Sequence, residues 1–296
     1  MNKALSLAFA VTTSLISTYS HANTDVIIAD IKIKNGHLVL ANHKNISART
    51  GYDNQPNFAP DNSGVYYTAM FETGADSAQT DTLFYRFSDG KTKNITNSKN
   101  TSEYSPTPYQ DGERLSFIKV EEDGTQRLWS LAVDSGQQTI LNQSIKPVGY
   151  HAWGNKGNLA LFVLGEPMTL QYVDTANQAQ GKVVAGDIGR SIRYNSSLDL
   201  FSFSQGITQQ QFSTFDVDSQ TAKNHIALPS GSEYYTWLDD RHLLSAQGNR
   251  IMIWPYGNDA SGWRLWADAK HLCSTTISRM NINHDQSKIA VVCDEQ

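Results

Sequence analysis

The chain has 296 residues, of which 39% are hydrophobic and 18% are charged, and its formal net charge is −5. The low charged fraction excludes a disordered chain, and the length is sufficient to bury a sizeable core. A mildly acidic protein has no bulk attraction for nucleic acid or anionic lipid, so we expect neither as a partner.

Residues 1–22 are typical of a signal peptide. Lys3 provides a positive start, residues 4–15 are mostly apolar, and Ser20-His21-Ala22 fits a cleavage site. The apolar stretch is shorter than the roughly 20 residues that a membrane-spanning helix needs. We therefore expect cleavage before Asn23 and a periplasmic or secreted domain over residues 23–296. Loss of Lys3 would change the net charge from −5 to −6.

A repeat begins at residue 51. Its clearest part is Gln55-Pro56-Asn57-Phe58-Ala59-Pro60-Asp61-Asn62, followed by an alternating apolar run at residues 65–68. A shift of 50 residues places Pro106-Thr107-Pro108 over Pro56-Asn57-Phe58, and residues 115–118 over the alternating run. This pattern predicts a repeated β unit of between 40 and 50 residues.

One anchor position recurs along the chain, occupied by Phe58, Pro108, Trp153, Tyr194, Trp237 and Ile282. The successive intervals are 50, 45, 41, 43 and 45 residues. The interval that wraps from Ile282 through the carboxy-terminus and on from Asn23 to Phe58 is 50 residues. Six units therefore account for the whole mature chain, as a closed ring requires.

Each unit contains four short strand patterns separated by polar turns, which predicts an all-β, six-bladed β-propeller with four-stranded blades. The last blade is expected to combine carboxy-terminal inner strands, at residues 277–282 and 288–293, with amino-terminal outer strands at residues 26–33 and 38–47. Such pairing closes the ring and removes exposed sheet edges. The aspartates of the turns could form a calcium ladder, but tight turns alone explain them.

The first unit resembles the Pro-x-aromatic-Ser-Pro-Asp-Gly repeat of TolB-like six-bladed propellers. Lys44-Asn45-Ile46-Ser47 and Lys93-Asn94-Ile95-Thr96 are similar to the closing Leu-Thr of that repeat. The resemblance extends over residues 25–294, with sharp motifs in the first two units. TolB itself has an α/β domain before its propeller, whereas only a signal peptide is expected here. The chain therefore resembles the stand-alone secreted members of the family.

The loops that enter the innermost strands are expected to surround the channel mouth, where propellers usually bind their ligands. Candidate ligand- or partner-binding residues in these loops are Tyr52, Asp53, Gln55, Glu103, Tyr104, Tyr150, His151, Arg190, Arg193, Glu233 and Tyr234. The alternative is that the tyrosines pack between blades and the acids are solvated. Together with Glu121, Glu122 and Glu166, these residues predict an acidic mouth with one basic sector, suited to a cationic or mixed-charge partner.

The leading hypothesis is an exported, non-catalytic binding or scaffold protein that contacts a protein, peptide or cell-envelope ligand through the mouth. The sequence has no nucleophile elbow, metal-ligand spacing or phosphate loop, so no cofactor or metal is expected. The alternative is a propeller enzyme of the lyase, lactonase or glycosidase type, with His151, Arg193 and Glu233 as catalytic candidates. A third reading is an assembly or sensory accessory that uses the outer rim. The sequence indicates no oligomeric state.

Cys273 and Cys293 are the only cysteines. Cys273 precedes the first strand of the last blade and Cys293 ends the second, so the hairpin returns both to one face. An exported protein meets an oxidising compartment, which favours a disulfide between them. Two separate buried thiols are the alternative.

Overall fold

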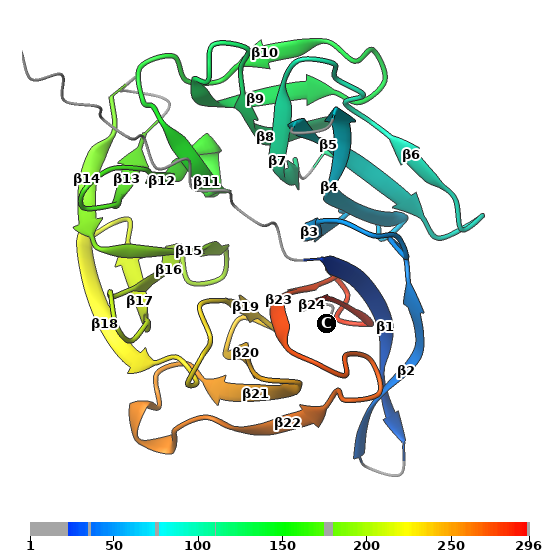
Figure 1. Ribbon diagram of the computed structural model, residues 1–296. Helices are drawn as coiled ribbons and strands as arrows, with labels where there is room; N and C mark the ends of the chain where they lie inside the picture. Colours follow the sequence, from blue (N-terminus) through cyan, green and yellow to red (C-terminus); the bar gives the residue numbers. More distant parts are fainter. Residues whose placement is uncertain (1–22, 35–36, 75–76, 110, 175–179, 295–296) are drawn as a thin grey trace, which may run out of the picture.

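The computed structural model describes residues 23–34, 37–74, 77–109, 111–174 and 180–294; the expected signal peptide lies outside them. Over the described residues, 24 strands form six four-stranded antiparallel sheets arranged in a ring (Figure 1). Two short 3-10 helices, η1 (Asn155–Gly157) and η2 (Asp259–Ser261), are the helical elements of this part of the chain. The predicted six-bladed β-propeller is confirmed.

The first three blades follow one another in chain order, each beginning at the channel and ending at the rim. Blade 1 contains β3 (Asp53–Phe58), β4 (Gly64–Gly74), β5 (Ser77–Arg86) and β6 (Thr92–Asn94). Blade 2 contains β7 (Ser102–Pro108), β8 (Arg114–Val120), β9 (Gln126–Ala132) and β10 (Gln138–Ile140). Blade 3 contains β11 (Val148–Trp153), β12 (Leu159–Val163), β13 (Thr169–Val173) and β14 (Lys182–Gly186).

Blades 4 and 5 keep the same order, and blade 6 is shared between the two ends of the chain. Blade 4 contains β15 (Ile188–Asn195), β16 (Leu200–Gln205), β17 (Gln211–Asp216) and β18 (Thr221–Ala227). Blade 5 contains β19 (Tyr235–Trp237), β20 (His242–Gln247), β21 (Arg250–Pro255) and β22 (Arg264–Asp268). Blade 6 contains β23 (Ile277–Ile282), β24 (Lys288–Asp294), β1 (Thr24–Lys34) and β2 (His37–Asn45).

The ring closes as the sequence predicts, because β1 pairs with β24 over seven residues of each strand, from Thr24 opposite Asp294 to Asp30 opposite Lys288. Cys273 and Cys293 form a disulfide, with their Cα atoms 5.6 Å apart. The bond joins the segment that enters blade 6 to the strand that carries the closing pairing. A disulfide fits an extracytoplasmic compartment.

The motifs Asn45-Ile46-Ser47 and Asn94-Ile95-Thr96 hold the ends of two outer strands in place. Each motif hydrogen-bonds to one buried aspartate of the neighbouring strand. In blade 6, Asp25 accepts hydrogen bonds from Asn45 Nδ2 at 2.6 Å and from Ser47 Oγ at 3.0 Å. In blade 1, Asp81 accepts the equivalent bonds from Asn94 Nδ2 at 2.8 Å and Thr96 Oγ1 at 2.9 Å. These bonds turn the chain away from the sheet, which is why β2 ends at Asn45 rather than at residue 47 as expected.

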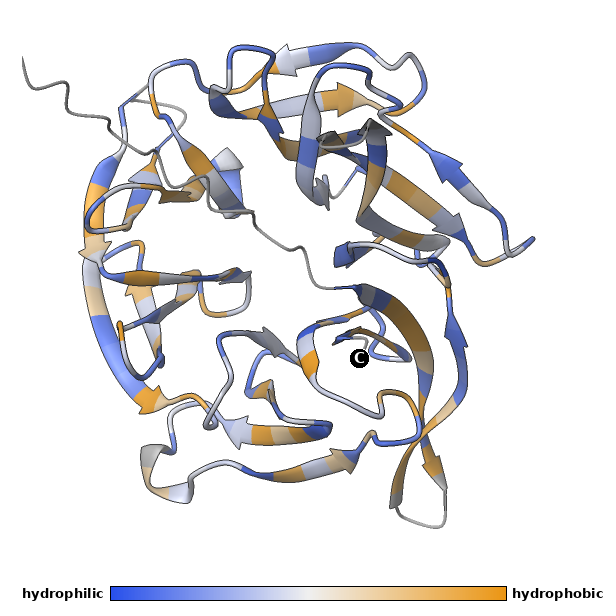
Figure 2. Cartoon of the chain, viewed as in Figure 1, coloured by the Kyte–Doolittle hydropathy of each residue, from blue (hydrophilic) through white to orange (hydrophobic). Residues whose placement is uncertain are grey.

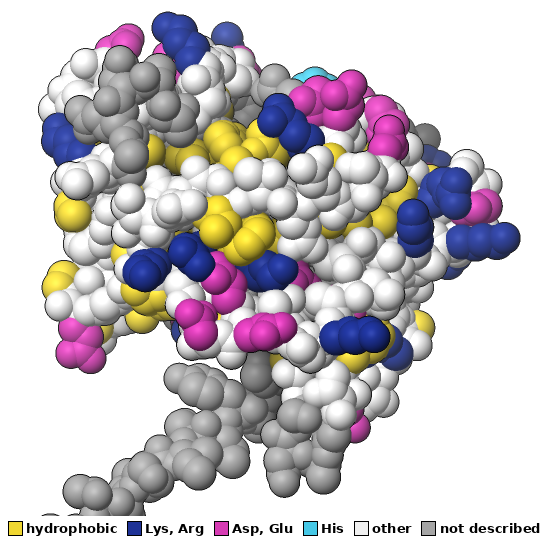
Figure 3. Space-filling model, turned by 90° about the horizontal axis from the view of Figure 1, so that it is seen from above, with side chains coloured by type: hydrophobic (Ala, Val, Ile, Leu, Met, Phe, Trp, Pro, Cys, Tyr) yellow, Lys and Arg dark blue, Asp and Glu magenta, His cyan; other side chains and the backbone are white. Residues whose placement is uncertain are grey.

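The core lies between neighbouring blades, where hydrophobic residues of the strands alternate with polar ones (Figure 2). Between blades 4 and 5, the completely buried Trp254 packs against Phe212 with their ring centroids 5.7 Å apart. On the side of the ring that Figure 3 shows, basic and acidic side chains are interspersed. That surface therefore presents no broad field of one sign.

Candidate ligand-binding site in the channel

The innermost strands carry β-bulges near the end at which they begin, which we call the channel mouth. The pairing register shifts between Asn54 and Asn57 in β3 and between Tyr104 and Thr107 in β7. It also shifts near the start of β11, β15 and β23. Gln55 and Ser105, within the first two bulges, have φ angles of 58° and 55°. Bulges re-aim side chains, and these five lie beside residues that line the channel cavity.

The residue three places before each anchor lies at the channel. These residues are Gln55, Ser105, Tyr150, Ser191, Tyr234 and Arg279. All but Tyr234 line a single cavity in the middle of the ring, and Tyr234 contacts Arg279. A strand directs alternate residues to the same side, so Asn57, Thr107 and Arg193, one place before their anchors, line the cavity too.

Arg279 is held between two tyrosines, Tyr150 of blade 3 and Tyr234 at the start of blade 5. Its Nη2 atom donates hydrogen bonds to Tyr150 Oη at 2.9 Å and Tyr234 Oη at 2.8 Å. The guanidinium carbon also lies 3.9 Å from the centroid of the Tyr234 ring, a cation–π contact. Burial disfavours the charged form of Arg279, but the surrounding phenols outweigh it and raise its pKa. Arg279 was not among the candidate residues predicted from the sequence, although its place in the repeat indicates the channel.

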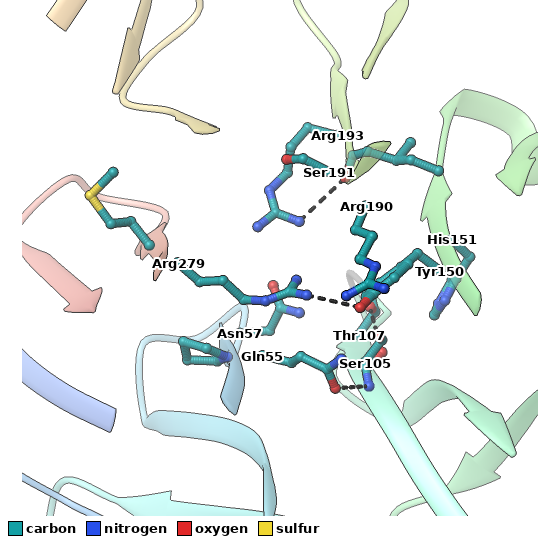
Figure 4. Close-up of a pocket in the computed structure, with 13 residues that line it drawn as sticks. Gln55, Asn57, Ser105, Thr107, Tyr150, His151, Arg190, Ser191, Arg193 and Arg279 are labelled. Carbon is teal, nitrogen blue, oxygen red and sulfur yellow. Dashed lines mark hydrogen bonds between the residues drawn. The ribbon is translucent and has the colours of Figure 1, made fainter. Parts of the chain in front are cut away.

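Two further arginines point into the same space (Figure 4). Arg193 Nη1 donates to the carbonyl of Ile192 at 3.3 Å, and its Nε atom is buried without a hydrogen-bond partner among the described residues. Burial lowers the pKa of Arg193. Arg190 is exposed at the mouth. The cavity between these side chains has a volume of about 30 Å³, enough for one small group.

The channel cavity is basic, whereas Glu166 and Glu233 lie in the wall of a pocket at the mouth. Arg190, Arg193 and Arg279 line the cavity, and no aspartate or glutamate is among its lining residues in the described part of the chain. None of the three forms an ion pair within 4.0 Å with a carboxylate of the described residues. Two acids of the entry loops, Asp53 and Glu103, point away from the cavity into local interactions.

Asp53 and Glu103 illustrate this difference. Asp53 is buried and pairs with Arg49 Nη2 at 2.7 Å. Glu103 is also buried, and it accepts hydrogen bonds from Thr101 Oγ1 at 2.7 Å and Ser98 Oγ at 2.8 Å. Burial raises the pKa of Glu103 despite these bonds. Both carboxylates therefore stabilise the entry loops rather than face a ligand.

His151 lies in the cavity wall with its imidazole turned between blades. Its Nε2 atom lies 2.7 Å from Ser116 Oγ, which also accepts a hydrogen bond from Trp153 Nε1 at 2.8 Å. Because the Ser116 hydroxyl donates to the carbonyl of Thr107 at 3.0 Å, we assign the proton of His151 to Nε2. Burial lowers the pKa of His151 to about 3, so the ring is neutral near pH 7.

Two side pockets open from the mouth, and Arg190 lines both. The larger, of about 720 Å³, lies between blades 3 and 4 and includes Pro167, Met168, Ile188, Ile207 and Glu233 in its wall. The smaller, of about 240 Å³, is lined by Gln55, Tyr104 and Tyr150 among others. Tyr52 is mostly buried near Arg279, and desolvation raises its pKa. The structure thus brings His151 and Arg193 to one cavity and Glu233 to its neighbour.

Comparison with known proteins defines the fold. No family model and no curated protein matches the sequence. Among solved structures, a protein assigned as TolB from Agrobacterium tumefaciens superposes with a TM-score of 0.69 and 13% identity, covering 93% of this chain and 99% of that one. TolB from Acinetobacter baumannii gives 0.59 and 9%, covering 91% and 63%. The fold is that of a TolB-like six-bladed propeller.

Enzymes share this TolB-like fold. A gluconolactonase from Xanthomonas campestris superposes with a TM-score of 0.63 and 9% identity, covering 89% of this chain and 94% of that one. Over the described residues, no helix has the length and apolarity to cross a bilayer, and no group of three or more His, Cys, Asp or Glu residues is arranged to hold a metal. The TolB-like fold therefore fits a binding role without deciding between binding and catalysis.

Proposed function

We propose that this protein is an exported binding module that takes up a protein, peptide or cell-envelope ligand at the channel mouth. The observation that supports it is the ring of polar and aromatic side chains three places before the anchors, five of which line one cavity from separate blades. Arg279, fixed by two tyrosines, gives this ring a rigid charged centre. Preorganised groups of this kind bind a ligand with little loss of conformational entropy.

The alternative, a propeller enzyme, is favoured by one observation: His151 and Arg193 line the same cavity. In such an enzyme Arg193 would neutralise a developing anion and His151 would transfer a proton. Both nitrogen atoms of His151 are buried, however, and Nε2 is engaged with Ser116. This arrangement is better suited to joining two blades than to accepting a proton from a substrate.

Site-specific photo-crosslinking tests the binding role. Ile207 at the mouth is 85% exposed, and Leu198, in the turn at the other end of blade 4, is 40% exposed. A photoreactive residue at position 207 should crosslink an envelope component that can be identified by mass spectrometry, whereas the same residue at position 198 should not. Crosslinks at 198 alone would contradict binding at the mouth and favour another surface. Turnover of a lactone panel that is lost in Arg193→Gln would support the enzyme.

A further inference from the structure

Two arginines of the channel, Arg193 and Arg279, have no carboxylate within 4.0 Å among the described residues, whereas Arg190 shares a pocket wall with Glu233. Arg193 and Arg279 lie within the channel, and Arg190 lies at its mouth. An unpaired buried charge is costly, so a protein that retains one generally pairs it with a bound ion or ligand. The partners that Arg279 has are neutral phenols, which orient its guanidinium without cancelling its charge.

The geometry of the cavity indicates the kind of anion. Arg193 retains a buried Nε donor without a partner, and a guanidinium fork matches the two oxygens of a carboxylate. The cavity is narrow, at about 30 Å³, and it suits a small anionic group better than a whole ligand. We therefore place the anionic group at the end of its ligand, with the rest of the molecule extending toward the mouth.

The pocket beside the channel indicates what is attached to that group. Arg190 lines both the channel cavity and the larger side pocket, so the cavity and the pocket are adjacent. Met168, Ile188 and Ile207 provide an apolar part of the lining within about 720 Å³, and the rest of the wall includes Glu166, Asp187 and Glu233. Ile207 is 85% exposed and belongs to the same wall as the buried Ile188, so an apolar group that entered the pocket would cover it. The pocket has ample room for one apolar side chain.

We propose that the channel mouth binds the free carboxy-terminus of a peptide, with the carboxylate between Arg193 and Arg279 and the terminal apolar side chain in the pocket lined by Ile188 and Ile207. This proposal rests on the proposed binding function and specifies its ligand. A sugar acid would also present a carboxylate, but it has no apolar side chain to place against Ile207. The charge and the apolar lining together therefore favour a peptide end.

Isothermal titration with short synthetic probes tests the proposal on the mature wild-type protein. The probes are N-acetyl-Gly-Gly-Leu as the free acid, its carboxamide, N-acetyl-Gly-Gly-Gly as the free acid, sodium glucuronate and inorganic phosphate. The free leucine acid should bind about tenfold or more tightly than its carboxamide, because a charge-assisted pair is lost in the amide. It should also bind about tenfold more tightly than the glycine peptide, through burial of the leucine side chain.

Variants show which residues produce the preference for the free carboxylate and which produce the preference for leucine. Arg279→Gln and Arg193→Gln should each weaken binding of the free acid at least about tenfold and reduce its preference over the carboxamide. Ile207→Ser should reduce the preference for leucine over glycine and leave the preference for the acid intact. Arg250→Gln is the matched control, since Arg250 is exposed at the start of β21, on the same face but outside the channel lining. It should bind the free acid as the wild type does.

Several outcomes would overturn the proposal. The wild type could bind the acid and the carboxamide equally well, or bind no peptide at millimolar concentration. It could also bind glucuronate or phosphate as tightly as the leucine peptide. The wild-type comparisons do not depend on how well an arginine variant folds. Crosslinking at position 207 without any preference for a free carboxylate would leave binding at the mouth supported and reject the carboxy-terminal ligand.

Discussion

The indole Nε1 of Trp153 donates a hydrogen bond to Ser116 Oγ at 2.8 Å, across the boundary between blades 2 and 3. Trp237 Nε1 makes the same bond to Ser202 Oγ at 2.9 Å, between blades 4 and 5. In both cases the tryptophan is the repeat anchor at the end of an innermost strand, and the serine lies in the second strand of the preceding blade. Two of the six anchors thus connect neighbouring blades through a buried polar contact.

Removal of one of these serine hydroxyls should destabilise the ring. Ser116→Ala leaves the indole N–H of Trp153 and the Nε2 of His151 without a buried partner, and we expect the free energy of unfolding to fall by about 2 kcal/mol. Chemical denaturation followed by tryptophan fluorescence measures this change. Ser88→Ala, at an exposed turn position, is the control and should change stability by less than about 0.5 kcal/mol. Equal stabilities of the two variants would show that the hydrogen bond contributes nothing.

His151 should make stability depend on pH. Burial lowers its folded-state pKa to about 3, below the unfolded value of about 6.5, so the unfolded chain binds a proton that the folded protein excludes. The free energy of unfolding should therefore fall as pH decreases from about 6.5 toward about 3, by at most about 1.4 kcal/mol per pH unit from this residue. His151→Gln should remove this part of the pH dependence.

Denaturation curves between pH 7 and pH 4 provide the measurement for His151. His284→Gln, which changes an exposed histidine in the turn between β23 and β24, is the matched control and should retain the wild-type slope. If the wild type and His151→Gln have parallel pH profiles, the ring of His151 is protonated in the folded protein or is accessible to water.

Asp81 should be essential to the stability of blade 1. Its carboxylate accepts hydrogen bonds from Asn94, Thr96 and the backbone and hydroxyl of Ser98, and it is almost fully buried. Asp81→Ala should lower the free energy of unfolding by about 3 kcal/mol, because several donors lose a charged acceptor. Asp134→Ala, at an exposed turn position, should be nearly neutral. A loss below 1 kcal/mol at Asp81, measured by chemical denaturation, would contradict this account of the motif.

The repeat allowed the fold to be predicted in detail. Anchors such as Phe58 and Ile282 end the innermost strands in the structure as the spacing indicates, and the interval that wraps through both termini predicts the shared blade 6. This succeeds because turn residues and alternating hydrophobicity are local properties that recur in each blade.

The candidate site was harder to predict because bulges decide which residues face the channel. Glu103 and Ser105 are two residues apart in β7, yet Glu103 is buried among loop hydroxyls while Ser105 lines the cavity. A bulge changes the alternation of side chains, and nothing in the local hydrophobic pattern marks it. Arg279 was identifiable only from its repeat position, where its equivalents include Tyr150 and Tyr234.

The disulfide should stabilise the closure of the ring. It links Cys293, which pairs with Asp25 of β1 in the closing ladder, to Cys273 at a sequence separation of 20 residues. A crosslink over a loop of this size lowers the entropy of the unfolded chain, and the entropic model gives a stabilisation of about 3 kcal/mol. Reduction should therefore lower the free energy of unfolding by about that amount.

Denaturation of the oxidised protein with and without a thiol reductant measures the contribution of the disulfide, and thiol counting under denaturing, non-reducing conditions should find no free thiol. The Cys273→Ala, Cys293→Ala double variant is the control, because its stability should not respond to the reductant. Both cysteines are buried against Ile277 and Leu272 in the core between blades 5 and 6, so the variant also loses some packing. The response to the reductant, rather than the absolute stability, therefore isolates the crosslink. An equal response of the wild type and the double variant would show that the disulfide does not stabilise the ring.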